Sequence, residues 1–282
     1  MAERADGSYS PGWRLISKII LRPLIPALMK IDGRGQENFP ATGGMILAAN
    51  HLSYFDVLAL SLFTDRAGRY PVFLAKSSLF SIKVLGPVLR KLGQLPVYRG
   101  QADAALVLRD AEQGLRDGAC VMFYPESTVT RDPEQWPMVA KSGVARLALA
   151  TGVPVIPAAH WGAQRILPYG SAIPKIIPRK RVQVLAGPPV DLSEFQNQPI
   201  TSAVLREATA KIMADITGLL AEIRHEIPPA TVFHPAVARR QERQELRKLT
   251  QPSKAAAGDG NSHSPGITQP AAEPDAAEAP PA

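Results

Sequence analysis

Short apolar runs alternate with stretches of helical periodicity between about residues 44 and 190. A short apolar run bounded by turn residues is typical of a buried strand, and apolar positions three and four residues apart are typical of a helix. Because strands that alternate with helices favour parallel pairing, the pattern predicts an α/β fold with a central, largely parallel sheet flanked by helices. The predicted strands are 44–49, 71–75, 94–98, 119–123, 153–159 and 181–185. The predicted helices are 53–63, 78–92 with a bend or break at Gly86-Pro87, 102–116 and 143–151.

The segment 13–30 is apolar at most positions, and a cation recurs every fourth residue, at Arg14, Lys18 and Arg22. This spacing places the cations along one stripe of an amphipathic helix. We expect the helix to lie in a membrane interface, with the cations toward lipid phosphates and apolar side chains toward acyl chains. These apolar side chains are Trp13, Ile16, Ile19, Ile20 and Leu24. The alternative is a helix that packs on its own domain.

The same segment does not fit a membrane-spanning helix, because no run in it reaches the ~18–20 uncharged apolar residues that a span needs. Arg22 also interrupts the stretch near its middle, which is atypical of a cleavable signal peptide. A single cysteine, Cys120, excludes an intramolecular disulfide and favours the cytoplasm. The sequence therefore predicts peripheral or monotopic attachment to the cytoplasmic side of the cell membrane.

The C-terminal part of the chain is predicted to hold two helices and a disordered tail. Apolar residues recur at helical spacing over 202–226, and five cations mark a basic helix over 236–249. The last 32 residues contain six prolines, nine alanines and one large apolar residue, too little to offset the entropy of ordering them. We predict a membrane-associating segment, an α/β domain, C-terminal helices and a disordered tail. Their boundaries are 10–32, 33–195, 196–250 and 251–282.

Charge narrows the class of partner. The 282 residues carry a net charge of +7, and the tail contributes −3, so residues 1–250 hold +10. A basic body indicates an anionic partner: phospholipid headgroups, a phosphate-bearing substrate or nucleic acid. The chain lacks a basic helix-turn-helix and an aromatic RNA-stacking motif, so we expect no nucleic-acid partner. It also lacks clustered cysteine and histidine ligands, so we expect no metal site.

A candidate catalytic pair follows the first predicted strand, in the sequence Asn-His-Leu-Ser-Tyr-Phe-Asp from Asn50 to Asp56. His51 emerges at the carboxyl end of a strand, where α/β sheets place ligands. If Ser53 caps the next helix, Asp56 falls at its third position and its carboxylate turns back toward His51. It can then hold one imidazole nitrogen while the other faces a substrate hydroxyl. The alternative is structural, because Ser-x-x-Asp is also a capping box.

Two further groups of polar residues follow predicted strands. Glu126, Ser127 and Thr128 come directly after the fourth strand, on the same edge of the sheet as the histidine. Arg99 ends the third strand, where its guanidinium can hold a phosphate. Each group has a structural alternative, because a Pro-Glu turn and a surface arginine are both ordinary features. These residues are candidate substrate-binding groups.

Together these blocks resemble those of the glycerolipid acyltransferase family, which includes the 1-acyl-glycerol-3-phosphate (lysophosphatidate) acyltransferases. The resemblance covers roughly residues 35–190. The family's first block is built on His-x4-Asp (HX4D), matched by His51 and Asp56, and its second ends in an arginine after a strand, matched by Arg99. Its fourth, Val-Pro-Val-Ile-Pro, is matched by 153–157.

The family's third block, Phe-Pro-Glu-Gly-Thr-Arg, is matched in part, by Glu126 with its preceding proline and by Thr128. Ser127 stands where the family usually has glycine, and Val129 stands where it usually has arginine. Arg131, two residues on, is the candidate replacement for that arginine. The loop is expected to contact the acceptor, so these departures bear on which acceptor binds.

The resemblance implies an acyltransferase that moves a fatty acyl group from acyl-CoA or acyl carrier protein to the hydroxyl of 1-acyl-glycerol-3-phosphate, giving phosphatidic acid in phospholipid biosynthesis. His51 would be the general base and Asp56 its orienting partner, since an imidazole has an ordinary pKa of ~6.5. Arg99 would hold the acceptor phosphate, and donors over 126–128 or backbone amides would stabilise the oxyanion. No metal or redox cofactor would be needed.

Two alternatives stay open. Within the acyltransferases, the acceptor could be glycerol-3-phosphate or another lysophospholipid. In a different class, the chain could be a non-catalytic peripheral protein that docks on an anionic membrane surface. That interpretation explains the charge but leaves His51 and Glu126 unexplained.

Overall fold

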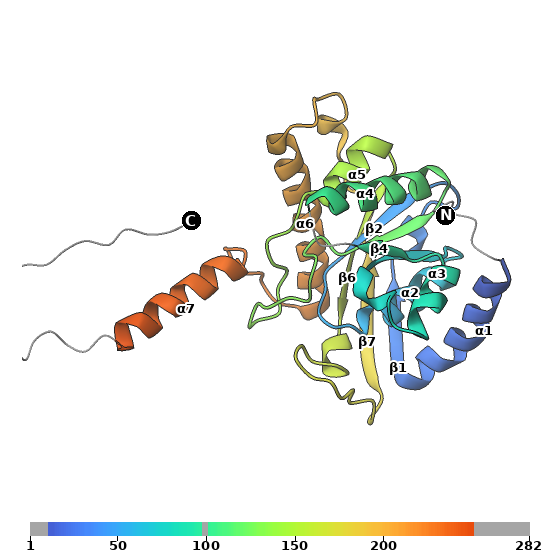
Figure 1. The fold of residues 1–282 in the computed structure, drawn as a ribbon, viewed down its shortest axis with the longest axis horizontal. Coiled ribbons are helices and arrows are strands. Elements are labelled where there is room, and N and C mark those ends of the chain that lie inside the picture. The colour runs from blue at the N-terminus through green and yellow to red at the C-terminus, as the bar shows by residue number, and fades with distance from the viewer. Residues whose placement is uncertain (1–10, 98–100, 251–282) are drawn as a thin grey trace, which may run out of the picture. The chain divides into compact units, whose positions relative to one another are not determined.

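A computed structural model describes residues 11–97 and 101–250, where the chain forms a seven-stranded sheet (Figure 1). The strand order is β1-β7-β6-β2-β5-β3-β4, and every pairing is parallel except the antiparallel one between β6 and β7. The predicted α/β fold with a largely parallel sheet is confirmed. The strands are β1 (Met29–Arg34), β2 (Met45–Ala49), β3 (Pro71–Lys76), β4 (Leu95–Val97), β5 (Cys120–Phe123), β6 (Val155–Trp161) and β7 (Lys180–Ala186).

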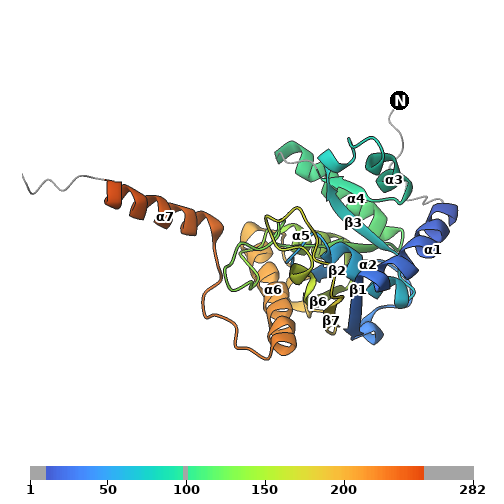
Figure 2. The same ribbon diagram turned by 90° about the horizontal axis from the view of Figure 1, so that it is seen from below.

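Helices cover both faces of this sheet, with α1 and α2 on one side and α6 on the other (Figure 2). The helices are α1 (Pro11–Leu28), α2 (Asp56–Arg66), α3 (Leu85–Lys91), α4 (Gln101–Arg116), α5 (Gly143–Thr151), α6 (Ser202–Arg224) and α7 (Pro235–Thr250). The chain divides at residue 238 into two units, and the sheet with α1 to α6 belongs to the first. The predicted tail 251–282 lies outside the described residues.

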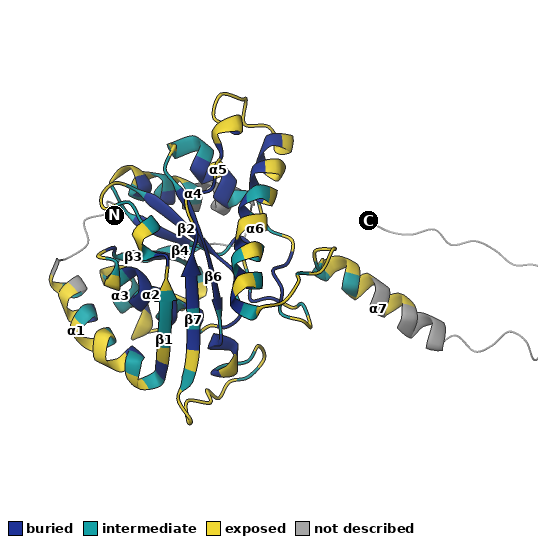
Figure 3. Cartoon of the chain, turned by 180° about the vertical axis from the view of Figure 1, so that it is seen from behind, coloured by how far each residue is buried: buried dark blue, intermediate teal, exposed yellow. Residues whose placement is uncertain are grey.

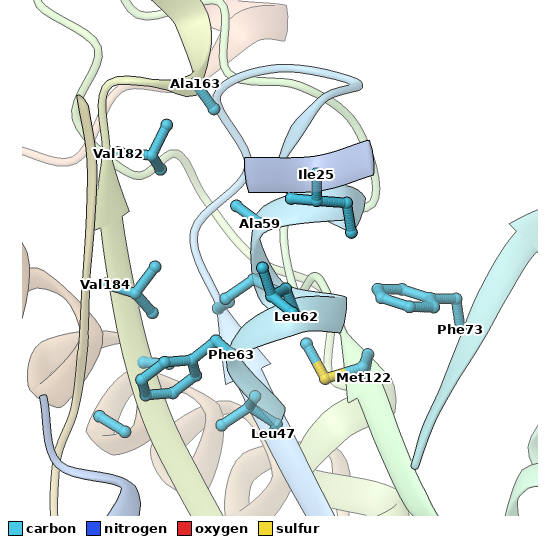
Figure 4. Packing of buried hydrophobic residues seen from close by; sticks show 14 of the residues in the cluster. Ile25, Leu47, Ala59, Leu62, Phe63, Phe73, Met122, Ala163, Val182 and Val184 are labelled. Carbon is cyan, nitrogen blue, oxygen red and sulfur yellow. The ribbon is translucent and has the colours of Figure 1, made fainter. Parts of the chain in front are cut away.

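Two large apolar clusters, with a smaller third one between β6, β7 and α6, hold the layers together. One lies between the sheet and the first two helices, where Ile25 of α1 and Phe63 of α2 pack over Leu47 and Met122 (Figure 4). The other lies on the opposite face, against α4, α5 and α6. The central strands β2 and β6 are buried along nearly their whole length (Figure 3). A strand buried on both faces needs a continuous apolar run, which is the pattern that the sequence shows.

Two segments differ from their predicted form. The predicted helix 13–30 ends at Leu28, and Met29 begins the edge strand β1, whose pairing with β7 comes from far along the chain. The predicted helix 78–92 is broken, but not at Gly86-Pro87 as expected: the break comes before Leu85, where α3 begins, and Gly86 and Pro87 lie in its first turn. A Cβ on Gly86 would lie 2.0 Å from the Phe80 carbonyl oxygen, so only glycine fits this close approach.

Helix α1 packs on its own domain with one side. Ile25 is 1% exposed, and Lys18 and Arg22 form ion pairs with Asp65 of α2 at 3.2 and 2.7 Å. The expectation that these two cations point toward lipid phosphates is therefore wrong in the docked helix, because α2 supplies their carboxylate. The other side of the helix leaves large apolar side chains exposed. They are Leu15, Ile16, Ile19, Ile20 and Leu24.

Trp13, which we expected among the membrane-facing residues, instead lies against Lys91, whose Nζ is 4.5 Å from the centre of the indole ring. The helix thus packs on its own domain, as the alternative interpretation has it, and still presents an exposed apolar face, whose membrane role stays a prediction. Among the helices of residues 11–97 and 101–250, none is long and apolar enough to cross a membrane.

Candidate active site

The two polar blocks predicted to carry chemistry lie side by side at one edge of the sheet. Strands β2 and β5 are adjacent and parallel, with Ala48 paired to Phe123. The loop after β2 carries His51, and the loop after β5 carries Glu126. Their convergence follows from the parallel pairing, because both strands end at the same edge.

His51 and Asp56 are in direct contact, with His51 Nδ1 2.9 Å from Asp56 Oδ2. Asp56 is completely buried, whereas the His51 side chain keeps 12% of its exposure, so the imidazole can be reached from outside. Because Nδ1 faces a carboxylate, it carries the ring proton, and Nε2 is left as the basic nitrogen.

The carboxylate of Asp56 also organises the loop that carries the histidine. Its Oδ2 accepts from the backbone N–H groups of Leu52 and Ser53 at 2.7 and 2.9 Å. The helix begins at Asp56 itself, so the expected placement of Asp56 at the third helical position is wrong. Ser53 Oγ instead accepts from Phe55 N–H and donates to the Leu167 carbonyl, at 3.1 and 2.8 Å. The Asp56 carboxylate therefore does both things that the sequence suggested as alternatives: it binds backbone N–H groups and it contacts His51.

A second histidine, which sequence reasoning missed, completes the surroundings of Asp56. His160 of β6 is fully buried, and its Nε2 lies 3.3 Å from Asp56 Oδ2 and 2.8 Å from the Asn50 carbonyl oxygen. Asn50 in turn accepts from the His160 backbone N–H through Oδ1 at 2.9 Å. From the sequence, a single histidine in an apolar strand is interpreted as a buried core residue. Only the pairing of β6 with β2 brings His160 to the site.

This environment keeps Asp56 ionised. Burial by itself would raise the pKa of Asp56, but the neighbouring His160 and His51 outweigh it and lower the pKa to about 2. For His160, burial opposes the charged form, whereas the adjacent Asp56 carboxylate raises the pKa. Asp56 is therefore a fixed negative charge beside His51 at neutral pH.

The ring of Tyr124 stacks on His51, with 4.1 Å between ring centres and an angle of 18° between the planes. Tyr54 meets the same imidazole edge-on at 6.2 Å. Together with the Asp56 contact, these rings restrict the rotation of the imidazole. Stacking on the electron-rich face of a tyrosine also favours a histidine that gains positive charge.

Glu126 connects the His51 loop to the segment around Met138 through two hydrogen bonds. Its Oε1 accepts from the His51 backbone N–H at 3.0 Å, and its Oε2 accepts from the Met138 N–H at 2.9 Å. The residue is 4% exposed, and burial raises the pKa of its carboxyl to about 8 against the effect of the two donors. Both carboxyl oxygens of Glu126 therefore accept hydrogen bonds from the backbone of the protein, one of them from the His51 loop.

The other predicted substrate-binding residues that the structure describes follow Glu126 in the same loop. Ser127 is exposed and has a left-handed backbone (φ 61°), a conformation that favours glycine. Thr128 is half-buried, Val129 is 1% exposed and belongs to the interior, and Arg131 is exposed. Arg99 lies outside the described residues.

Cys120 lies in β5, 1% exposed, and burial raises the pKa of its thiol to about 12. Since the thiolate is the reactive form of cysteine, this side chain is inert at neutral pH. Among the described residues at this sheet edge, the His51–Asp56 pair therefore remains the candidate for activating a nucleophile.

Comparison with known proteins gives matches over the same region. A model of the acyltransferase family matches residues 30–161. The chain is 31% identical over 161 residues to a chloroplastic 1-acyl-sn-glycerol-3-phosphate acyltransferase of Brassica napus, covering 55% of this chain and 44% of that protein. It is 28% identical over 202 residues to an Arabidopsis thaliana protein described in the same words, covering 70% and 52%. The chain therefore spans about half the length of these two relatives.

A Bacillus subtilis 1-acyl-sn-glycerol-3-phosphate acyltransferase is 26% identical over 167 residues, covering 58% of this chain and 75% of that protein. Among solved structures, the 1-acyl-sn-glycerophosphate acyltransferase from Thermotoga maritima superposes with a TM-score of 0.59 at 23% identity. This match covers 77% of this chain and 81% of the other. It shows that the two chains share a fold.

Proposed function

We propose that the chain is a member of the acyltransferase family, whose model matches residues 30–161, and that it transfers a fatty acyl group from a thioester donor to the hydroxyl of 1-acyl-glycerol-3-phosphate, giving phosphatidic acid. The observation that carries this proposal is the His51–Asp56 pair, with Nδ1 fixed by a buried carboxylate at a strand end. The names of the relatives support the choice of acceptor.

The proposed chemistry is a single displacement. His51 Nε2 takes the proton of the acceptor hydroxyl as its oxygen attacks the thioester carbonyl. The new ester C–O bond forms, the C–S bond breaks, and the imidazolium returns the proton to the departing thiolate. Asp56 holds the ring orientation and stabilises the imidazolium that forms between the two steps. An already activated acyl group needs no covalent enzyme intermediate, in accord with the inert Cys120.

In this proposal the acceptor is bound by the residues that follow the predicted strands in the sequence. Arg99 grips its phosphate, and Thr128, Ser127 or backbone amides donate to the oxyanion. Glu126 was expected to touch the acceptor, but its two backbone contacts support a different role, that of holding the His51 loop in place. No metal or redox cofactor takes part in these steps.

We further propose that the donor is acyl-CoA or acyl carrier protein and that the chain works at the cytoplasmic side of the cell membrane. The acceptor and the product are lipids, so the enzyme must collect one from a bilayer and return the other. The exposed apolar face of α1 supports peripheral or monotopic attachment to an anionic membrane surface.

The test is an assay of the purified chain with labelled acyl-CoA or acyl carrier protein against lysophosphatidate, glycerol-3-phosphate and other lysophospholipids. We expect labelled phosphatidic acid with lysophosphatidate as the preferred acceptor. Transfer only to glycerol-3-phosphate or to another lysophospholipid would overturn the assignment of the acceptor. Absence of transfer with every pair, from a folded protein that binds anionic vesicles, would instead favour a non-catalytic membrane protein.

A further inference from the structure

The connection between β6 and β7, residues 162–179, leaves the sheet beside the candidate active site. β6 runs parallel to β2, so it ends at the edge where the His51 loop begins, and β7 starts there in the opposite direction. Ser53, two residues after His51, donates to the Leu167 carbonyl at 2.8 Å. This connection therefore borders the site directly.

The outer part of this connection exposes large apolar side chains to solvent. Ile173 is 76% exposed and Ile177 is 86% exposed, and Tyr169 and Ile176 are exposed as well. A cluster of this kind within nine residues is costly in water unless something covers it. In Figure 1 the connection extends beyond the ends of β6 and β7, near the C-terminal end of α1.

The charge around these side chains has one sign. From residue 162 to 181 the sequence contains five cations and no aspartate or glutamate. The cations are Arg165, Lys175, Arg179, Lys180 and Arg181. Arg181 is paired with Asp32 of β1, whereas Arg165 and Lys175 are exposed. Apolar and basic side chains therefore alternate on one short surface, which is the chemistry of a segment that enters an anionic lipid surface.

The end of this connection contacts the C-terminal end of α1. Arg179 donates through Nη1 to the Pro26 carbonyl of α1 at 3.0 Å, and Met29, which follows that helix, pairs with Lys180 of β7. The exposed Ile20 and Leu24 lie within two turns of this contact, on the same helix. Two elements that are far apart in the sequence thus present apolar side chains from neighbouring positions.

We propose that residues 167–179 insert into the headgroup region of an anionic bilayer and, with α1, hold the sheet edge that carries His51 against the membrane. That the bound lipid surface supplies the acceptor rests on the proposed function. An acidic protein would be attracted by the same cations, but it gives no reason for isoleucines as exposed as Ile173 and Ile177. A bilayer accounts for both the charge and the apolar side chains.

A fluorescent probe tests the insertion itself, without using enzyme activity. The native Cys120 is buried, so Ile177→Cys can be labelled selectively with an environment-sensitive fluorophore. The matched control is Ile227→Cys, at a position 93% exposed after α6. With vesicles of phosphatidylcholine and phosphatidylglycerol, we expect a blue shift at position 177 and none at 227. The shift should weaken with phosphatidylcholine alone and at high salt.

A second pair of variants measures the contribution to binding. Ile173→Asp/Ile177→Asp should lower partitioning onto the anionic vesicles by at least about tenfold, whereas the control Ile227→Asp/Val232→Asp should leave it unchanged. Turnover of a short-chain acceptor dissolved as monomers should survive in both, which separates a membrane defect from a failure of the proposed chemistry. If the wild-type chain transfers no acyl group but the 177 probe still shifts, only the proposed function fails.

Other outcomes overturn the inference. If the full chain sediments with the vesicles but the probe at 177 does not respond, α1 binds the membrane without this segment. If the chain does not bind the vesicles at all, the surface has another use. A response at 177 to purified acyl carrier protein, without any response to vesicles, would assign the surface to an acidic protein instead.

Discussion

Ser127 occupies a backbone conformation that glycine adopts with less strain. Its φ is 61°, and its side chain is exposed. A left-handed backbone costs a non-glycine residue roughly 1–2 kcal/mol, part of which a glycine gives back through its more flexible unfolded state. We therefore expect Ser127→Gly to raise the free energy of unfolding by up to about 1 kcal/mol, measured by urea denaturation. A loss of stability would show that the serine side chain contributes contacts that outweigh the strain.

His160 is a positioning residue in this account, because it touches Asp56 and the Asn50 carbonyl rather than a reacting atom. His160→Leu removes a donor from a buried carboxylate, so the Asp56 pKa should rise and the imidazole of His51 should be held less well. We expect kcat to fall about 10-fold to 100-fold with little change in KM, and the pH profile of kcat to shift.

His160→Gln is the matched variant, since its amide N–H can replace the Nε2 donor. It should restore most of the activity and the wild-type pH profile. Equal loss in both variants, with the same pH profile, would mean that His160 serves only to fill the interior.

Because of Glu126, the free energy of unfolding should depend on pH between about 4.5 and 8. The pKa of Glu126 is raised in the folded chain to about 8 from an ordinary 4.5, so between these values the unfolded state releases a proton that the folded state keeps. The free energy of unfolding should therefore fall as pH rises from about 4.5 to 8 and then level off. Asp56 acts in the opposite sense, because its lowered pKa adds stability that is lost as pH falls from 3.8 toward 2.

Urea denaturation of the wild type and Glu126→Gln across this range separates the two effects. The variant should be flatter between pH 4.5 and 8 and should keep the acid-side loss. An unchanged slope in the variant would show that the Glu126 carboxyl is ionised in the folded chain throughout this range.

At the scale of elements, α1 is held by apolar burial more than by its ion pairs. Lys18 and Arg22 are 38% and 56% exposed, and exposed pairs contribute little, whereas Ile25 is 1% exposed. Ile25→Ala should lower the free energy of unfolding by about 2–4 kcal/mol, and Asp65→Asn by less than about 1 kcal/mol. The measurement is urea denaturation of both variants. A larger effect from Asp65→Asn would mean that the ion pairs, not the apolar contact, fix the helix.

The way α1 docks also explains which part of its prediction was right. A helical wheel shows that cations and apolar residues lie on different stripes, but it does not show which stripe meets the protein. In the structure Ile25 packs inward and Lys18 and Arg22 lie beside Asp65 of α2, which leaves the isoleucines of the opposite stripe exposed. The membrane role of that face stays a prediction.

Across the whole molecule, the sequence predicted what depends on local pattern and on strand ends. The order of strands and helices follows from apolar runs, and His51, Asp56 and Glu126 converge because their strands are parallel. Pairings between segments that are distant in the sequence could not be predicted from it. The edge strand β1 exists only through β7, and His160 reaches Asp56 only because β6 lies beside β2. Neither pairing leaves a signal in the local sequence.

The central claim is that His51, oriented by Asp56, is the base for acyl transfer. Its most direct test is kcat/KM of His51→Ala for lysophosphatidate with acyl-CoA, beside the wild type and His234→Ala as a control at an exposed histidine. A general base contributes at least ~10²-fold to the rate, so kcat/KM of His51→Ala should fall by at least that factor. The melting temperature of His51→Ala and the activity of His234→Ala should both stay near the wild-type values. Near-normal turnover by a folded His51→Ala protein would contradict the account.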